Sequence, residues 1–220
     1  MYMKVKRLID IFLSLIGLLL LAPLFLVIFI AIKVESRGPV FFKQKRIGLN
    51  KKSFYILKFR TMKVNAPKDT PTHLLGNPDQ YITKVGIILR KTSLDELPQI
   101  WNILVGQMSI IGPRPALWNQ YDLINERDKY DANTVTPGLT GWAQVNGRDE
   151  LPIEVKSRYD GEYVDNISFG MDLKCFLRTI ISVIKTDGVV EGGTGTTALK
   201  EIASSEENFS NEKNINNRKK

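Results

Sequence analysis

The chain has 220 residues, of which 43% are apolar, and a formal net charge of +8 at pH 7. This length supports one domain with a hydrophobic core, and the apolar content argues against a disordered chain or a polytopic transporter. A single cysteine, Cys175, excludes a disulfide scaffold, and a single histidine, His73, excludes a His-rich metal site. The charge is uneven, because residues 1–60 contain 12 basic and only 2 acidic side chains.

An apolar segment occupies residues 11–32 and is interrupted only by Ser14, Gly17 and Pro23. A helix of that length extends about 33 Å, enough to cross the hydrocarbon core of a bilayer. Basic residues flank the segment on both sides, which favours placing both ends in the cytoplasm against anionic phospholipid headgroups. Because proline breaks helices, we expect a re-entrant helix–break–helix at Ala22-Pro23; the alternative is a single span with a kink.

The remainder predicts a small, mainly helical α+β domain with a short hairpin. We expect, in chain order, strands at 40–43 and 53–59, a surface loop at 63–80 that contains His73, helices at 81–90 and 93–104, an irregular stretch at 106–115, and helices at 116–130 and 173–185. The last helix is amphipathic and either packs on the core or lies in the membrane interface. The expected division is a membrane segment at 1–38, a catalytic domain at 39–190 and a disordered polar tail at 191–220.

The densest group of reactive side chains surrounds two adjacent carboxylates, Asp95 and Glu96. Ser93 and Glu96 have the spacing of a capping box, so the acids are placed in a first helical turn, where they complement the helix dipole. Pro98 loosens that turn, and Arg90 lies close enough in sequence to keep Asp95 ionised. The segment therefore admits a structural role or a catalytic one, as nucleophile or Mg²⁺ ligand.

Cationic and amide side chains elsewhere are candidates for binding phosphate or a nucleotide. Arg114 stands between two prolines, which present its guanidinium from a stiff backbone. Lys58 and Arg60 alternate along a strand, and we expect them to share one side. Gln144, Asn146 and Arg148 alternate along an extended run, which places them on one side, and Trp142 before them either stacks on a ligand or is buried. Walker and Rossmann glycine motifs and an H-E-x-x-H helix are absent from the sequence.

Five segments together resemble the bacterial sugar transferases, a family of small monotopic phosphoglycosyl transferases. They are residues 6–10 (KRLID), 58–62 (KFRTM), 93–99 (SLDELPQ), 112–115 (GPRP) and 137–145 (PGLTGWAQV). The resemblance extends from about residue 4 to residue 188, and the motifs occur in the family's order. Family members commonly have serine before the membrane proline, where this chain has Ala22.

The resemblance implies a UDP-sugar donor, undecaprenyl phosphate as acceptor, Mg²⁺ as cofactor, and initiation of a surface glycan at the cytoplasmic membrane. It places the family's catalytic dyad, which also holds the metal, on Asp95 and Glu96. We hypothesise that Asp95 attacks the sugar-bearing phosphorus and that Arg114, with Lys58, Arg60 and Arg90, steadies phosphate oxygens.

Other classes of function are open on the sequence alone. A non-catalytic membrane-tethered scaffold or an anionic-lipid-binding module of a glycan assembly complex uses the same basic end. A phosphohydrolase that uses Asp95 releases free sugar phosphate instead. Nucleic acid is not an expected partner, because residues beyond 60 carry no basic stripe. The sequence does not specify the sugar or the oligomeric state.

Overall fold

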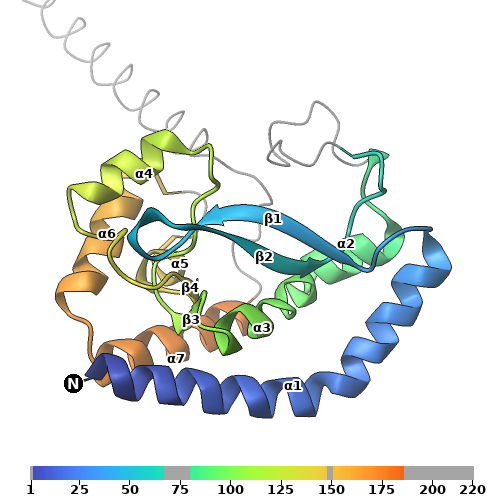
Figure 1. Ribbon diagram of the computed structural model, residues 1–220, viewed down its shortest axis with the longest axis horizontal. Helices are drawn as coiled ribbons and strands as arrows, with labels where there is room; N and C mark the ends of the chain where they lie inside the picture. Colours follow the sequence, from blue (N-terminus) through green and yellow to red (C-terminus); the bar gives the residue numbers. More distant parts are fainter. Residues whose placement is uncertain (1, 67–79, 148–150, 186–220) are drawn as a thin grey trace, which may run out of the picture.

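The computed structural model describes residues 2–66, 80–147 and 151–185. Helix α1 (Tyr2–Glu35) lies along one side of a small α+β domain (Figure 1). The other elements are, in chain order, β1 (Phe41–Ile47), η1 (Leu49–Lys51), β2 (Ser53–Phe59), α2 (Lys84–Lys91), η4 (Leu94–Glu96), α3 (Gln99–Leu104), β3 (Ser109–Ile111), α4 (Tyr121–Asp128), β4 (Gly138–Thr140), α5 (Trp142–Val145), α6 (Ile153–Asp165) and α7 (Phe169–Lys185). The predicted fold class is confirmed. The predicted tail lies outside the described residues.

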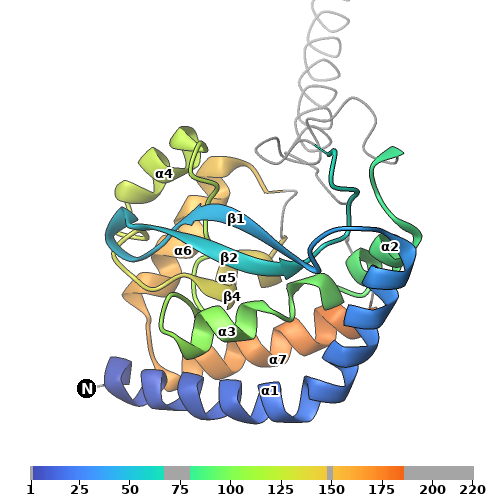
Figure 2. The same cartoon turned by 45° about the vertical axis from the view of Figure 1, so that its right-hand side comes forward.

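Helix α1 is continuous, although Pro23 lies inside it. The ribbon bends along its length (Figures 1 and 2). A proline is a usual cause of such a bend, because it lacks one N–H donor and its ring crowds the preceding turn. At Ala22-Pro23 the structure has a bend within one helix in place of the expected break, since one missing hydrogen bond leaves the turns on either side helical. The re-entrant placement of this helix stays a prediction.

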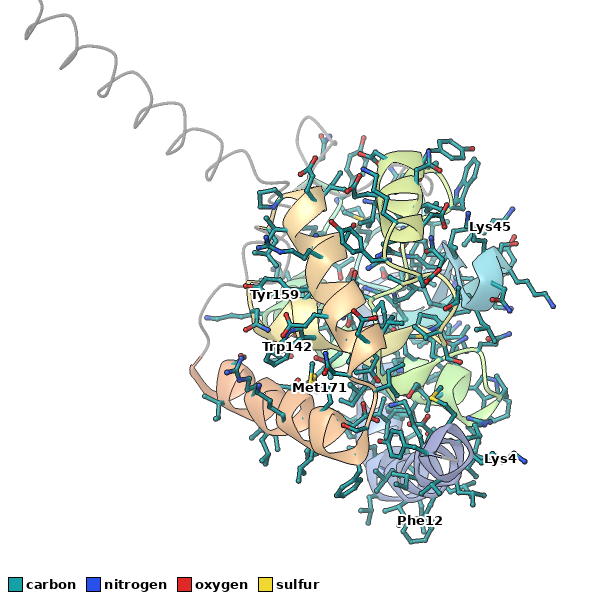
Figure 3. All side chains as sticks on the ribbon, turned by 90° about the vertical axis from the view of Figure 1, so that its left-hand side faces the viewer. Lys4, Phe12, Lys45, Trp142, Tyr159 and Met171 are labelled. Atoms are coloured by element: carbon teal, nitrogen blue, oxygen red, sulfur yellow. The ribbon has the colours of Figure 1, made fainter. Side chains whose placement is uncertain are left out.

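The two sides of α1 differ sharply in polarity. Lys6, Asp10 and Ser14, spaced four residues apart, are buried with 6, 4 and 3% exposure, so a polar stripe faces the domain. The opposite side is apolar and exposed, and Figure 3 shows Phe12 on it. By length and composition α1 is able to cross a membrane, and only 11% of its most apolar window is buried. In the first part of α1 this pattern is the reverse of an ordinary surface helix, whose apolar stripe faces the core, whereas Ile28 and Ile32 near its end are buried in an apolar cluster.

The strands form two separate pairs. Strands β1 and β2 make the predicted antiparallel hairpin, in which Phe41 pairs with Phe59. Asn102, from α3, binds the free edge of β2, where its amide contacts Tyr55 O at 2.8 Å and Leu57 N at 2.9 Å. Strands β3 and β4 pair in parallel. The stretch at 106–115, which was expected to be irregular, therefore contains a short strand. A three-residue strand is too short for its alternation to be recognised in the sequence.

Three helical predictions need correction. The helix expected at 93–104 is split into η4 and α3, because Pro98, which has no N–H to continue the preceding turn, is the N-cap of α3. The helix expected at 116–130 is shortened to α4. No element was expected where α6 lies; its buried side includes Ser157, Asp160 and Gly161, so no apolar stripe marks it.

Helix α7 packs one side on the core and leaves its other side exposed. Cys175 is fully buried and belongs to a core cluster with Ile111, Trp142 and Tyr163. The other side of α7 is apolar and exposed, and consists of Phe169, Leu173, Phe176, Leu177, Ile180 and Ile181. Figure 2 shows α7 beside the first part of α1, and the hydrogen bonds from Tyr2 and Lys6 to Asp172 join the two helices.

Candidate active site

The two candidate carboxylates lie in the short turn η4, between α2 and α3. The predicted capping box is wrong: Ser93 has a left-handed backbone with φ 56°, and its side chain makes no capping hydrogen bond. Ser93 instead ends the preceding helix, because its N–H donates to Arg90 O at 3.0 Å. The reciprocal capping role that the spacing allowed for Ser93 and Glu96 is thereby removed, while both acids remain in the first turn of η4.

Glu96 is held by two cations from different parts of the chain. Arg114 contacts both carboxylate oxygens through its two terminal nitrogens, with Nη1 3.1 Å from Oε2. Lys58 Nζ, from β2, lies 2.8 Å from Oε1. Burial alone raises the pKa of Glu96, but Arg114 and Lys58 outweigh it and hold that pKa well below its usual range. Glu96 is therefore a fixed, ionised carboxylate.

Asp95 has a different environment, although it is the adjacent residue. It is 8% exposed, and among the described residues its carboxylate accepts no hydrogen bond; its ion pair is with Lys58 Nζ at 3.7 Å. Burial raises the pKa of Asp95; Lys58 opposes that shift, whereas the charge of Glu96 adds to it. A buried carboxylate without hydrogen-bond donors is poorly stabilised as an anion, which is the condition of a reactive oxygen.

The structure brings Lys58 and Arg114 to the dyad, whereas Arg60 has another place. Arg60 donates to Arg37 O at 2.7 Å and Ser36 O at 2.8 Å, so it binds the carbonyls at the end of α1. The expectation that Lys58 and Arg60 share one side is corrected, because β2 ends at Phe59 and the alternation ends with it.

Arg90, from α2, lies near the dyad. Its Nε donates to Thr61 Oγ1 at 2.9 Å, and its charge lowers the pKa of Asp95. That effect is smaller than the opposing effect of burial. Arg90 is therefore the third cation, after Lys58 and Arg114, whose charge acts on the dyad.

The glycine-rich segment differs from the expected extended run. Trp142 and Gln144 belong to the short helix α5, and Arg148 lies outside the described residues. Trp142 is buried, and its ring lies under Lys174 at 4.5 Å and Arg178 at 4.8 Å, both from α7 (Figure 3). The alternative of a buried tryptophan therefore holds. Both amide atoms of Gln144 are buried without a hydrogen-bond partner among the described residues.

The dyad can be compared with the needs of Mg²⁺. The described ranges contain no group of three or more His, Cys, Asp or Glu side chains. Mg²⁺ needs fewer protein ligands, because it commonly retains water and binds one or two carboxylates together with substrate phosphates. The Asp95 carboxylate fits this role, because it is buried and accepts no hydrogen bond from the described residues.

The sequence analysis missed a buried polar network that joins α1 to this region. Asp10 accepts a hydrogen bond from Ile110 N at 3.0 Å. Lys6 Nζ lies 2.5 Å from Asp172, whose other oxygen accepts from Tyr163 Oη at 2.7 Å. The signal in the sequence is the placement of Lys6, Asp10 and Ser14 four residues apart at the start of an otherwise apolar helix.

Comparison with known proteins places these residues in a family context. The family model for bacterial sugar transferases matches residues 1–186. The chain is 40% identical over 188 residues to the uncharacterized sugar transferase EpsL of Bacillus subtilis, which covers 85% of this chain and 91% of that protein. It is 37% identical over 197 residues to the exopolysaccharide production protein ExoY of Rhizobium meliloti, which covers 83% and 87%.

A third relative is much longer. The UDP-glucose:undecaprenyl-phosphate glucose-1-phosphate transferase of Xanthomonas campestris is 42% identical over 192 residues, which are 83% of this chain and 39% of that protein. The chain thus corresponds to about two fifths of that transferase. The family match covers both the long apolar helix and every described element of the domain, and this chain belongs to the bacterial sugar transferase family.

Proposed function

We propose that the protein transfers a sugar 1-phosphate from a UDP-sugar to undecaprenyl phosphate and releases UMP. The observation that carries the proposal is the contrast between two adjacent carboxylates: Glu96 is fixed by Lys58 and Arg114, whereas Asp95 is buried, lies 3.7 Å from Lys58 Nζ and accepts no hydrogen bond from the described residues. The printed name of the Xanthomonas campestris relative describes transfer of glucose 1-phosphate to undecaprenyl phosphate, which supports the same reaction class. The names of the ExoY relatives support a role in making a surface polysaccharide.

In the first step, an oxygen of Asp95 attacks the sugar-bearing phosphorus of the donor. The bond from that phosphorus to the bridging oxygen breaks, and UMP leaves with the electron pair. A phosphosugar ester of Asp95 remains. In the second step, a phosphate oxygen of undecaprenyl phosphate attacks the same phosphorus, the bond to Asp95 breaks, and the carboxylate is restored. Neither step needs a net proton transfer, so the scarcity of histidine is no obstacle.

The surrounding charges suit this chemistry. Both substrates are polyanions, so a carboxylate approaches the phosphorus only where positive charge offsets the repulsion. Lys58 lies 3.7 Å from Asp95 and 2.8 Å from Glu96, and Arg114 anchors Glu96 from the other side. Mg²⁺ held at Asp95, whose carboxylate accepts no hydrogen bond from the described residues, would neutralise phosphate charge in the donor. Glu96 holds Lys58 and Arg114 in place, and Asp95 is left as the nucleophile.

The exposed apolar sides of α1 and α7 support placement at a membrane. Both helices lie on the same side of the domain (Figures 1 and 2). Exposed apolar faces of this size are unfavourable in water and favourable in contact with acyl chains. We propose that these helices seat the domain on the cytoplasmic face of the inner membrane, among anionic phospholipids. A soluble nucleotide sugar and a lipid-linked acceptor then meet at one interface.

The experiment that tests the function uses the purified full-length protein with Mg²⁺, undecaprenyl phosphate and a panel of UDP-sugars. The measured products are UMP and the lipid-linked sugar. The Asp95→Asn variant is expected to abolish UMP release, whereas Asp165→Asn, an exposed position at the end of α6, serves as the matched control. Without acceptor, the wild-type protein should release at most one UMP per chain and gain a phosphosugar on the peptide that contains Asp95. Failure of every donor to yield UMP would favour a scaffold, and free sugar phosphate a hydrolase.

A further inference from the structure

A second charged pair lies behind Arg114, on the side away from the dyad. Arg127, from α4, and Asp160, from α6, are 3% and 1% exposed. Arg127 Nε and Nη2 both donate to Asp160 Oδ2, at 2.8 and 2.6 Å. This is a fully buried ion pair, and the reaction proposed above assigns it no part.

The remaining nitrogen of the Arg127 guanidinium, Nη1, contacts the Arg114 backbone. Arg127 Nη1 donates to Arg114 O at 2.9 Å. The two flanking carbonyls are also held: Pro113 O accepts from Gly138 N at 2.9 Å, and Pro115 O accepts from Arg46 Nη1 at 3.0 Å. Because Pro113 and Pro115 have no N–H to donate, their carbonyls are the backbone groups through which this segment can be anchored.

Stability alone does not explain the buried ion pair between Arg127 and Asp160. Two charges taken out of water carry a large desolvation penalty, and well-packed apolar side chains often replace such pairs without loss of stability. Burial raises the pKa of Asp160 despite the opposing charge of Arg127, which reflects this penalty. In addition, Asp160 Oδ1 is buried without a hydrogen-bond partner among the described residues. A geometric role explains why a guanidinium is present: its fork binds Asp160 while the remaining nitrogen reaches a carbonyl.

We propose that Arg127 and Asp160 are positioning residues that hold the Arg114 backbone so that its guanidinium stays on Glu96. The inference rests on the proposed function, since it assigns the pair an effect on that reaction. Asp160 orients Arg127, Arg127 fixes the Arg114 carbonyl, and Arg114 fixes Glu96 beside Asp95. Small displacements at an active site are costly, about 100-fold in rate for roughly 1 Å.

The test is a double-mutant cycle measured by UMP release. The variant Arg127→Met/Asp160→Leu replaces the pair with apolar side chains and leaves no unpaired charge. In the wild-type background we expect kcat to fall by about 10- to 100-fold with little change in the KM for the donor. In the Arg114→Ala background, or Arg114→Lys where turnover is below detection, the same replacement should cause no further loss, because its effect passes through Arg114.

Two results would overturn the inference. One is wild-type kcat in the folded double variant; the other is an equal loss of kcat in both backgrounds, as a purely structural role predicts. Where the double variant does not fold, Arg127→Lys enters the same cycle, because lysine keeps the charge but cannot form the three contacts. Leu123→Ala, buried on the same helix as Arg127 in a cluster with Ala116 and Ile124, is the control for lost stability. Turnover by the wild-type protein tests the proposed function separately.

Discussion

The polar stripe of α1 makes a prediction about how this helix is attached to the domain. In the Lys6→Met variant the ammonium that neutralises Asp172 is lost, and the buried carboxylate retains only hydroxyl partners, Tyr2 and Tyr163. The side chains of Lys6 and Asp172 are 7% and 11% exposed, so water cannot replace the missing charge. Breaking a buried ion pair on one side costs about 3–5 kcal/mol.

That cost converts into a large shift in thermal stability. For a chain of 150–250 residues, 1 kcal/mol corresponds to about 2–4 °C in the unfolding midpoint, so Lys6→Met should lower the midpoint by about 6–20 °C. The assay is thermal unfolding in detergent, followed by tryptophan fluorescence. The double variant Lys6→Met/Asp172→Asn should recover part of the loss, because no uncompensated charge is left and the amide oxygen still accepts from Tyr163.

Lys4→Met is the matched control, since it makes the same chemical change two residues away at an exposed position that projects from the domain (Figure 3). Its midpoint should stay within about 2 °C of the wild type, as surface substitutions usually change stability by less than about 0.5 kcal/mol. Equal shifts in Lys4→Met and Lys6→Met would refute the docking of the polar stripe against the domain.

Three further predictions concern stability at the site and the hairpin. Asp95→Asn should raise the unfolding midpoint at pH 7.5, because it removes a buried negative charge. This gain should vanish as the pH falls through the raised pKa of Asp95 toward about 4, because the protonated carboxyl of the wild type carries no charge to desolvate. Glu96→Gln should lower the free energy of unfolding by about 1.5–3 kcal/mol. Because the pKa of Glu96 is lowered, this loss should persist down to about pH 4.3 and fade only in stronger acid. Unfolding scans across pH check this dependence. Asn102→Leu should cost about 1–3 kcal/mol in the same assay, since it removes two partly buried hydrogen bonds from the edge of β2, whereas exposed Asn166→Leu should not.

The parts of the site that were predictable are those set by local chemistry. Asp95 and Glu96 are adjacent in sequence, so they are necessarily adjacent in space, and the two prolines around Arg114 limit its backbone whatever the tertiary structure. The hairpin followed from two strand-like runs joined by a turn, although β1 extends to Ile47, beyond the expected 40–43. The long apolar helix needed only length and hydropathy.

The parts that were missed depend on contacts between distant segments. Ser93 matches a capping box by spacing, but the end of α2 determines its backbone, and a left-handed residue cannot cap the following turn. Arg60 continues the alternation of the strand in the sequence, but in the folded chain its guanidinium donates to the carbonyls of Ser36 and Arg37 after α1 rather than contacting the dyad. No spacing rule connects Arg127 with Asp160, which are 33 residues apart.

The same long-range contacts explain how a membrane helix and a phosphate-binding site can share one scaffold. Strand β3 leads directly into Arg114, and its backbone is held from both sides: Asp10 of α1 accepts from Ile110 N at 3.0 Å, and Tyr163 of α6 donates to Ile111 O at 3.3 Å. Strand β3 thus links α1 to Arg114, whose guanidinium anchors Glu96.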